Sequence, residues 1–408
     1  MKIERPRGTR DFLPDEMEKR RRIELIMRRI AENYGYREIM TPTFEHLELF
    51  TIKSGEDIIR EMYTFKDKSG RDLVLRPELT APVMRLFVNE CSGYPKPIRF
   101  YYFLNCFRYE RPQKGRYREF WQFGVELIGS DSYLADAEVI SLAHRIMSEL
   151  KVDFELHIGH VGVLRTVLRD LDERISSKIM RLIDKKDVDG LEVFLDEIGA
   201  DPDMRETVFS LIEMVGGRDV IEEAKELVNF DFSNMERLCC ILDELGIDYK
   251  LNLGIARGLD YYTGIVFEAY AKSGLGAQNQ ICGGGSYRLA HLFGGSDVPA
   301  TGFALGFDRI AEVCKVDLDR RKKVVVVAVK GLEKEAFKIA EILRDKVTAI
   351  VDVMERSVKR QLSYANDIDA DFAVIIGKRE LDKGKISVKD LRTGEQRVMS
   401  VEEFMEVL

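Results

Sequence analysis

The spacing of apolar positions predicts the elements of the first half of the chain. In residues 15–33 apolar side chains recur every three or four positions, which predicts an amphipathic helix. Continuous apolar runs at 101–107 and 120–128 predict two strands, and the polar segment 111–115 predicts the loop of an antiparallel hairpin between them. The same two kinds of signal predict further strands at 36–42, 73–75, 152–158, 250–255 and 265–270, and helices at 80–89 and 136–150.

The pattern changes in the middle of the chain and again near its end. Between residues 162 and 245 strand signals fade, and charged amphipathic helices are predicted at 174–182, 189–198, 205–215, 219–227 and 235–245. Glycine-rich turns are predicted at 283–285 and 294–295. Beyond a charged linker, strands are predicted at 324–329, 348–352, 372–376 and 385–391, alternating with helices at 333–346, 357–366 and 401–407. We therefore predict a core of residues 1–161 and 246–316, a helical insertion at 162–245 and a C-terminal α/β domain at 323–408.

Composition narrows the class of protein. The chain has 408 residues, 45% hydrophobic and 33% charged, which is typical of a globular protein with more than one domain. Its six cysteines form no CxxC pair, so we expect reduced thiols and neither a zinc site nor a disulfide framework. The sequence has no apolar run long enough for a membrane helix, and its opening residues lack a signal-peptide core, so we expect a cytoplasmic protein that does not enter a membrane.

A local basic cluster stands against the overall charge. The chain carries a net charge of -8, yet between Arg99 and Arg118 six basic residues face the single acid Glu110. Such a density of positive charge suggests a site for a polyanion such as a nucleoside triphosphate or an RNA end. The alternative is an ordinary solvated charged hairpin.

Four segments then occur in an informative order. They are Thr-Pro-Thr-Phe-Glu at 41–45, the basic hairpin, Ala-Arg-Gly-Leu-Asp-Tyr-Tyr-Thr-Gly at 256–264, and Gly-Phe-Ala-Leu-Gly-Phe-Asp-Arg at 302–309. In this order they resemble the signature motifs of class II aminoacyl-tRNA synthetases, and the third is similar to the segment that distinguishes histidyl-tRNA synthetases. The resemblance covers nearly the whole chain.

The resemblance implies a fold and a reaction. The expected fold is α+β: a class II synthetase-like antiparallel sheet flanked by helices forms the catalytic core, with a helical insertion and a C-terminal domain like an anticodon-binding domain. The expected reaction is ATP-dependent activation of L-histidine to histidyl-adenylate, followed by transfer to the 3′ end of tRNA(His). ATP would enter with Mg²⁺, without zinc, an organic cofactor or a direct protein ligand to a metal. A homodimer is expected, because in this class the motif around Pro42 builds the interface.

The resemblance also implies residue roles at the phosphates, and the chemistry suits them. Arginine binds phosphate oxygens through a planar fork that stays charged, as transfer at phosphorus requires. Arg108 would hold the α-phosphate and the attacking carboxylate, and Arg116 and Arg309 would bind the terminal phosphates. Phe120 would stack on adenine. Arg257 would act near the α-phosphate as a catalytic residue, beside the histidine.

A second set of residues would recognise histidine. A neutral imidazole carries one donor and one acceptor, and each needs a partner where water is excluded. By resemblance Glu126 would accept the ring N–H, and Tyr262 would meet the other nitrogen. The α-ammonium group would meet Glu78, Thr80 and Gln122, and Tyr287 would line the site. The chain departs from the family at Ser286 and Arg288, where many members have Arg and Asp, so no role is assigned to those two positions.

RNA contacts are expected at two places. Gln113 and Lys114 in the hairpin loop would meet the acceptor end of the tRNA. The C-terminal domain is nearly neutral, and RNA loops are often read by stacking and base edges rather than by charge alone. Arg356, Lys359, Arg360 and Gln361 are candidate anticodon contacts, and a solvated helix face is the alternative.

Three further interpretations fit parts of the sequence. Residues 157–160 spell His-Ile-Gly-His, a motif of the other synthetase class, but they lack its Rossmann context, so we expect a structural role. A catalytically silent relative is the main alternative to an active enzyme, namely the histidine-sensing regulatory subunit of ATP phosphoribosyltransferase. Such relatives generally lack the C-terminal domain and the phosphate-binding arginines, both of which this chain has. A pure RNA-binding module would leave the histidine-binding set unexplained.

Overall fold

A nine-stranded sheet organises the first of two units. The computed structural model describes residues 3–54, 56–111, 115–256, 261–316 and 321–408, and the chain divides into Met1–Val316 and Asp317–Leu408. In the first unit the strand order is β1-β5-β6-β12-β11-β10-β7-β9-β8. The strands are β1 (Arg37–Glu38), β5 (Ile98–Phe107), β6 (Glu119–Ile128), β7 (Phe154–His160), β8 (Val215–Gly216), β9 (Lys250–Asn252), β10 (Tyr262–Ala271), β11 (Gln280–Tyr287) and β12 (Ala300–Gly306).

Most neighbouring strands in this sheet are antiparallel. β5 and β6 form the predicted hairpin, with Ile98 opposite Ile128 and Phe107 opposite Glu119. The β1–β5 and β7–β9 pairs are parallel. Of the strand predicted at 36–42, only Arg37–Glu38 pair in the sheet, as β1. Pro42 does not end this strand but lies before the next one, as expected for a residue whose backbone has no N–H to donate to a sheet.

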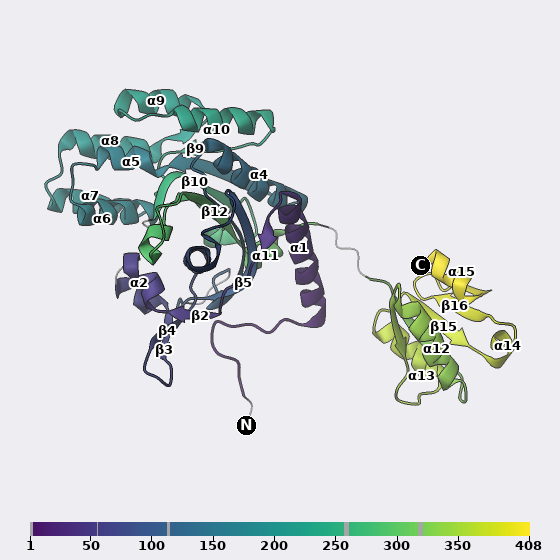
Figure 1. Ribbon diagram of the computed structural model, residues 1–408. Helices are drawn as coiled ribbons and strands as arrows, with labels where there is room; N and C mark the ends of the chain where they lie inside the picture. The colour runs from purple at the N-terminus through teal and green to yellow at the C-terminus, as the bar shows by residue number, and fades with distance from the viewer. Residues whose placement is uncertain (1–2, 55, 112–114, 257–260, 317–320) are drawn as a thin grey trace. The chain divides into compact units, whose positions relative to one another are not determined.

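Helices cover the sheet and build its core (Figure 1). The helix α4 (Tyr133–Glu149) packs against β12, β11 and β6, and α1 (Pro14–Asn33) packs against α4 and against α11 (Phe307–Val313). The side chains of α4 that face the sheet include Val139, Ile140 and Ile146, all fully buried. A smaller sheet has the order β2 (Phe44–His46), β4 (Asp72–Leu75), β3 (Tyr63–Lys66), and Val74 of β4 packs in a core with residues of α2 (Glu48–Ser54), α3 (Thr80–Leu86) and the 3-10 helix η4 (Ala290–Phe293). The 3-10 helix η1 (Glu56–Glu61) contacts α2, and the π-helix η2 (Phe87–Cys91) contacts α3.

The middle of the chain folds as charged helices, drawn in teal at the top of Figure 1. They are α5 (Val161–Val167), α6 (Glu173–Asp184), α7 (Val188–Glu197), α8 (Pro202–Glu213), α9 (Asp219–Leu227) and α10 (Ser233–Glu244). The short strand β8 interrupts them and pairs with β9 at the edge of the large sheet. The segment thus consists of helices apart from β8, and this strand was not predicted because two residues carry too little pattern to detect.

The glycines at 283–285 do not form the predicted turn. They lie in the middle of β11, where Gly284 pairs with Phe303 and Gly285 with Gly302. A Cβ on Gly284 would overlap the carbonyl oxygen of Gly302, and Gly285 has a φ of 148°. Here glycine permits close approach of strands rather than a reversal of the chain.

The second unit is a five-stranded sheet with helices on both faces. Its order is β14-β13-β15-β16-β17. Alternate residues of β13 point to opposite faces: Val324 and Val326 pack with the α12 side, and Val325 and Val327 pack with the α13 side. The elements are β13 (Lys323–Ala328), α12 (Glu333–Arg344), β14 (Thr348–Val351), α13 (Val358–Asp367), β15 (Phe372–Ile376), α14 (Lys378–Leu381), β16 (Ile386–Asp390), β17 (Gln396–Met399) and α15 (Val401–Val407). None of the helices among the described residues has the length and apolar character needed to span a membrane.

Candidate active site

A buried carboxylate lies at the centre of the large sheet. Glu126 of β6 is 1% exposed and lies opposite Gly302 of β12. Its Oε1 accepts hydrogen bonds from the hydroxyls of Thr80 (3.0 Å) and Tyr102 (3.4 Å), and its Oε2 accepts one from the Tyr287 hydroxyl (2.6 Å). We call these four side chains the Glu126 cluster. Burial raises the pKa of Glu126 to about 8, although the hydroxyls favour its charged form.

The start of α3 brings a second carboxyl group to this cluster. Glu78 accepts hydrogen bonds from the backbone N–H groups of Thr80 (2.6 Å) and Ala81 (3.1 Å), two donors that the first turn of a helix leaves unpaired. Burial raises the pKa of Glu78, while these N–H groups and the nearby Arg108 oppose the shift. The hydrogen bonds from these N–H groups to Glu78 hold the first turn of α3 in place, with the Thr80 hydroxyl directed to Glu126.

Aromatic side chains and an amide complete this side of the site. Tyr262 of β10 lies opposite Tyr287 of β11, and both are buried. The ring of Tyr261 lies 4.9 Å from that of Tyr262 and 5.6 Å from that of Tyr287, between ring centroids. Gln122 of β6 accepts a hydrogen bond from the Cys106 thiol at 3.3 Å, which fixes the orientation of its amide.

Three arginines converge beside these residues, and we call them the arginine cluster. Arg108 donates from Nε to the Pro77 carbonyl oxygen (2.9 Å), and its guanidinium carbon lies 5.1 Å from the centre of the Phe120 ring. Arg116 pairs with Glu110. The contact of Arg108 with the residue before Glu78 joins the arginine cluster to the Glu126 cluster.

Arg309 is held by neutral oxygens. It donates to the carbonyl oxygens of Gly115 (2.9 Å) and Gln280 (2.6 Å) and to the side-chain oxygen of Gln278 (3.2 Å). Burial lowers the pKa of Arg309, and the positive charges of Arg108 and Arg116 lower it further. The cations of the cluster therefore repel one another, and an anion bound between them would relieve that repulsion.

Some predicted residues cannot be placed. Arg257 lies outside the described residues, and so do Gln113 and Lys114. The other predicted residues of the first unit lie in the two clusters or beside them: Glu78, Thr80, Arg108, Arg116, Phe120, Gln122, Glu126, Tyr262, Tyr287 and Arg309.

Sequence reasoning missed two residues of the site. Tyr102 donates to Glu126, and only strand register could have revealed that contact. Asp308 is buried and accepts hydrogen bonds from Arg20 (2.8 Å) and from the backbone N–H of Trp121 (2.7 Å), and it also pairs with Arg10. Asp308 stands directly before the predicted site residue Arg309, and that position was the signal available in the sequence. In the structure its carboxylate anchors the first turn of α11.

Ser286 and Arg288 have contacts of their own. The Ser286 hydroxyl donates to the buried Asp136 of α4 at 2.7 Å, and burial raises the pKa of Asp136 to about 6. Arg288 pairs with Asp297 (2.9 Å) and Asp131 (3.2 Å). Ser286 and Arg288, which differ from the family pattern, thus flank Tyr287 without disturbing its hydrogen bond to Glu126.

The His-Ile-Gly-His segment has the predicted structural role. His160 accepts a hydrogen bond from the Gly162 N–H at 3.0 Å and caps α5. His157 lies between Glu155 (2.5 Å) and Asn252 (3.0 Å). Both histidine side chains thus make hydrogen bonds to neighbouring residues of the fold.

The second unit holds the remaining candidates. Lys359 and Arg360 are exposed at the start of α13. Arg356 pairs with Asp352 at 3.3 Å, and its guanidinium carbon lies 4.6 Å from the centre of the Tyr364 ring. Gln361 is 6% exposed and bonds to the Ala328 backbone through both ends of its amide, so its prediction as an RNA contact is wrong.

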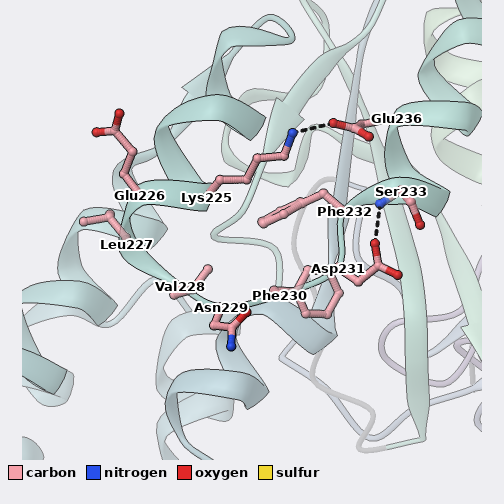
Figure 2. A pocket seen from close by; sticks show the side chains of 10 residues that line it. All are labelled: Lys225, Glu226, Leu227, Val228, Asn229, Phe230, Asp231, Phe232, Ser233 and Glu236. Atoms are coloured by element: carbon pink, nitrogen blue, oxygen red, sulfur yellow. Dashed lines mark hydrogen bonds and ion pairs between the residues drawn. The ribbon is translucent and has the colours of Figure 1, made fainter.

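A depression of about 500 Å³ lies apart from these clusters, in the connection between α9 and α10 (Figure 2). Lys225 points across it to Glu236 at 2.6 Å and also contacts Glu222 at 2.9 Å. Glu226 and Asp231 add further negative charge to the lining. The acidic lining does not suit a polyanion, and none of the predicted site residues lines this depression.

Comparison with known proteins finds relatives of both units. Residues 8–310 match the family model described as histidyl-tRNA synthetase, and residues 323–408 match the anticodon binding domain. The chain is 62% identical to a histidine–tRNA ligase of Archaeoglobus fulgidus over 100% of both chains, and 53% identical to one of Methanosarcina acetivorans over 100% of this chain and 98% of the relative. The structure of apo S. aureus histidyl-tRNA synthetase is similar with a TM-score of 0.73 and 30% identity, over 100% of this chain and 99% of that one.

Proposed function

The chain belongs to the histidyl-tRNA synthetase family, and from that premise we propose that the Glu126 cluster binds histidine and the arginine cluster binds ATP. The predicted family, fold class and enzyme class are confirmed by the matches along the full chain. The activity is that of a histidine–tRNA ligase: histidine is activated with ATP, and tRNA is charged. The histidine-sensing regulatory subunit is not favoured, because the curated relatives over the full length are ligases.

One observation carries the assignment of sites: a buried carboxylate with three hydroxyl partners lies next to converging cations. In our proposal Glu126 accepts one ring N–H of histidine and Tyr262 meets the other nitrogen, with Tyr287 alongside. Glu78, Thr80 and Gln122 receive the α-ammonium group, which needs anionic or neutral acceptors. A site that bonds both ring nitrogens rejects apolar analogues by a factor of about 10⁴, because its own polar groups would otherwise stay unpaired.

The arginine cluster is proposed to bind the triphosphate. The carboxylate of histidine attacks the α-phosphorus, the bond to the bridging oxygen breaks, and pyrophosphate leaves. Arg108 holds the attacking carboxylate and the α-phosphate together, and Arg116 and Arg309 take the charge that grows on the leaving group. Phe120 stacks on adenine, and Arg257 is proposed as a second catalytic cation from the family motif. Mg²⁺ is proposed to enter as part of the Mg·ATP substrate.

The RNA contacts and the domain roles are also proposals. The catalytic core would comprise 1–161 and 246–316, with the insertion at 162–245 and the anticodon-binding domain at 323–408. The terminal ribose hydroxyl of tRNA(His) would attack the carbonyl carbon of the adenylate, and AMP would leave. Gln113 and Lys114 are proposed at the acceptor end, and Arg356, Lys359 and Arg360 at the anticodon.

We further propose a cytoplasmic homodimer, since translation supplies its tRNA substrate in that compartment. Exposed apolar side chains near the Pro42 motif support a second copy as partner: Phe44 is 53% exposed and Met40 is 76% exposed. The Phe44 ring of β2 lies edge-on to the Phe65 ring of β3, across the intervening strand β4, with 6.2 Å between centroids, and Phe65 is also exposed. Sedimentation equilibrium of the wild type and Phe44→Asp tests this, and a monomeric wild type would contradict it.

Pyrophosphate exchange tests the proposed assignment of substrates. Labelled pyrophosphate should enter ATP in the presence of histidine without tRNA, and none of the other standard amino acids should support the exchange. Exchange with histidine alone would establish activation and specificity together. Histidine binding without any exchange would contradict the catalytic role of the arginine cluster.

A further inference from the structure

Tyr102 is not part of the sequence motifs, and it reaches the site because the residue opposite it, Gly124, has no side chain. It lies on β5 opposite Gly124 of β6 and is 1% exposed. A Cβ on Gly124 would overlap the Tyr102 hydroxyl. The missing side chain therefore lets the tyrosine ring lie along β6, with its hydroxyl 3.4 Å from Oε1 of Glu126, two residues further along that strand.

The two carboxylate oxygens of Glu126 accept different numbers of hydrogen bonds from the surrounding hydroxyls. A carboxylate offers about four acceptor positions, two on each oxygen. Thr80 and Tyr102 both donate to Oε1, whereas Tyr287 is the one side chain among the described residues that donates to Oε2. The bare backbone of Gly302 leaves room for Oε2, since a Cβ there would overlap this oxygen. Within the part of the chain that the structure describes, one acceptor position thus remains, and it is on Oε2.

We propose that Tyr102 is a positioning residue for histidine selection, which acts through Glu126. By sharing Oε1 with Thr80, it leaves Oε2 as the acceptor for a single N–H of the substrate ring. This inference rests on the proposed role of Glu126 and adds to it: specificity depends on the hydroxyls that fill the other positions of the carboxylate. A ring without an N–H donor leaves the open position on Oε2 unpaired.

The groups around Glu126 determine how the loss of Tyr102 would depend on pH. Thr80 of α3, Tyr102 of β5 and Tyr287 of β11 donate to it, and Glu78 before α3 is the nearby like charge. A hydroxyl donor favours the charged form of a carboxyl group, so its removal raises the pKa of Glu126. Histidine binding should then weaken most at low pH, and it should recover as the pH rises and the carboxylate forms again.

The test compares Tyr102→Phe with Tyr101→Phe. Tyr101 is the preceding residue, equally buried, and its hydroxyl donates to Glu32 at 2.8 Å, away from the Glu126 cluster. In pyrophosphate exchange, Tyr102→Phe should raise the histidine KM about tenfold at pH 6.5–7.5, the loss expected for one hydrogen bond to a charged group. The increase should shrink to about threefold or less at pH 8.5. The ATP KM should stay at the wild-type value, and Tyr101→Phe should resemble the wild type throughout.

A second pair of readouts separates selection from folding. The preference for histidine over thiazolylalanine, whose ring has an acceptor nitrogen but no N–H, should fall in Tyr102→Phe and not in Tyr101→Phe. Gly124→Ala, which displaces the Tyr102 ring, should change the histidine KM in the same direction. A Tyr102→Phe enzyme with wild-type histidine KM, pH profile and preference would overturn the inference. If Glu126→Gln also left histidine binding unchanged, the proposed function of Glu126 would fail instead.

Discussion

The Glu126 cluster and the arginine cluster both include residues of the β5–β6 hairpin, yet the charged groups of the two clusters have different partners. Glu126 is enclosed by hydroxyls of the protein and is 1% exposed. Arg309 is bonded to neutral oxygens and faces two other cations. One side is assembled before substrate arrives, and the other keeps a surplus of positive charge until an anion binds.

The two ligands proposed for the clusters would account for the difference. An imidazole side chain is small and neutral at physiological pH, so a site selects it by a few fixed hydrogen bonds that water cannot replace. A triphosphate brings several negative charges, and free guanidinium charge is what attracts it and stabilises charge in the transition state. The two clusters should therefore be separable by mutation.

Loss of Arg108 should have the largest effect. Arg108→Ala removes the cation that joins the two clusters, and the exchange rate should fall about 100- to 1,000-fold, as for loss of one main donor to a transition state. Arg29→Ala is the matched control, since this exposed arginine of α1 pairs with Glu149 of α4 at 3.2 Å. An Arg108→Ala enzyme with normal turnover would remove this residue from the chemistry.

Loss of Glu126 should affect only one substrate. Glu126→Gln removes the carboxylate that forms as the pH reaches about 8, so at pH 8 the histidine KM should rise about 10- to 100-fold, and the ATP KM should change little. Steady-state exchange with each substrate varied in turn gives both constants. Equal increases in the two constants would show that the clusters are not separate.

The pH dependence of stability should reveal the buried carboxyl. The pKa of Glu126 is raised from its ordinary value to about 8, so the folded protein keeps a proton that the unfolded chain releases. This contribution to the free energy of unfolding is fully present below the ordinary carboxyl pKa and is lost as the pH rises towards 8.

Urea unfolding of the wild type and Glu126→Gln between pH 5 and 8 measures that loss. The free energy of unfolding of the wild type should fall more steeply, by up to about 1.4 kcal/mol per pH unit. Asp136, whose pKa is raised to about 6, is present in both proteins and cancels in the difference. Parallel curves would mean that Glu126 is ionised across this range.

The smallest effect is expected in the C-terminal unit. Joint replacement of Arg356, Lys359 and Arg360 by Ala should raise the tRNA KM about three- to tenfold, and exchange without tRNA should stay unchanged. The pair Lys378→Ala and Arg379→Ala, exposed on α14, is the control. Wild-type charging by the triple variant would support a merely solvated face at the start of α13.

The sequence predicted those parts of the structure that depend on local pattern. The apolar runs of β5 and β6 and the helical spacing of α1 each exceed one full repeat of their period, so they were found close to their observed bounds. The glycines of β11 were placed in a turn, because a single sequence does not separate close strand approach from chain reversal. Tyr102 was missed because its contact with Glu126 depends on register across two strands and on a missing side chain at Gly124.

Histidine binding in the absence of ATP tests the central contrast most directly. Calorimetric titration at pH 8 should show saturable binding of histidine to the empty enzyme, unchanged in Arg309→Ala and at least tenfold weaker in Glu126→Gln. That result would mean that the Glu126 cluster is complete on its own, while the arginine cluster waits for its anion. Histidine binding that appears only with ATP, or that Arg309→Ala weakens as much as Glu126→Gln does, would contradict the account.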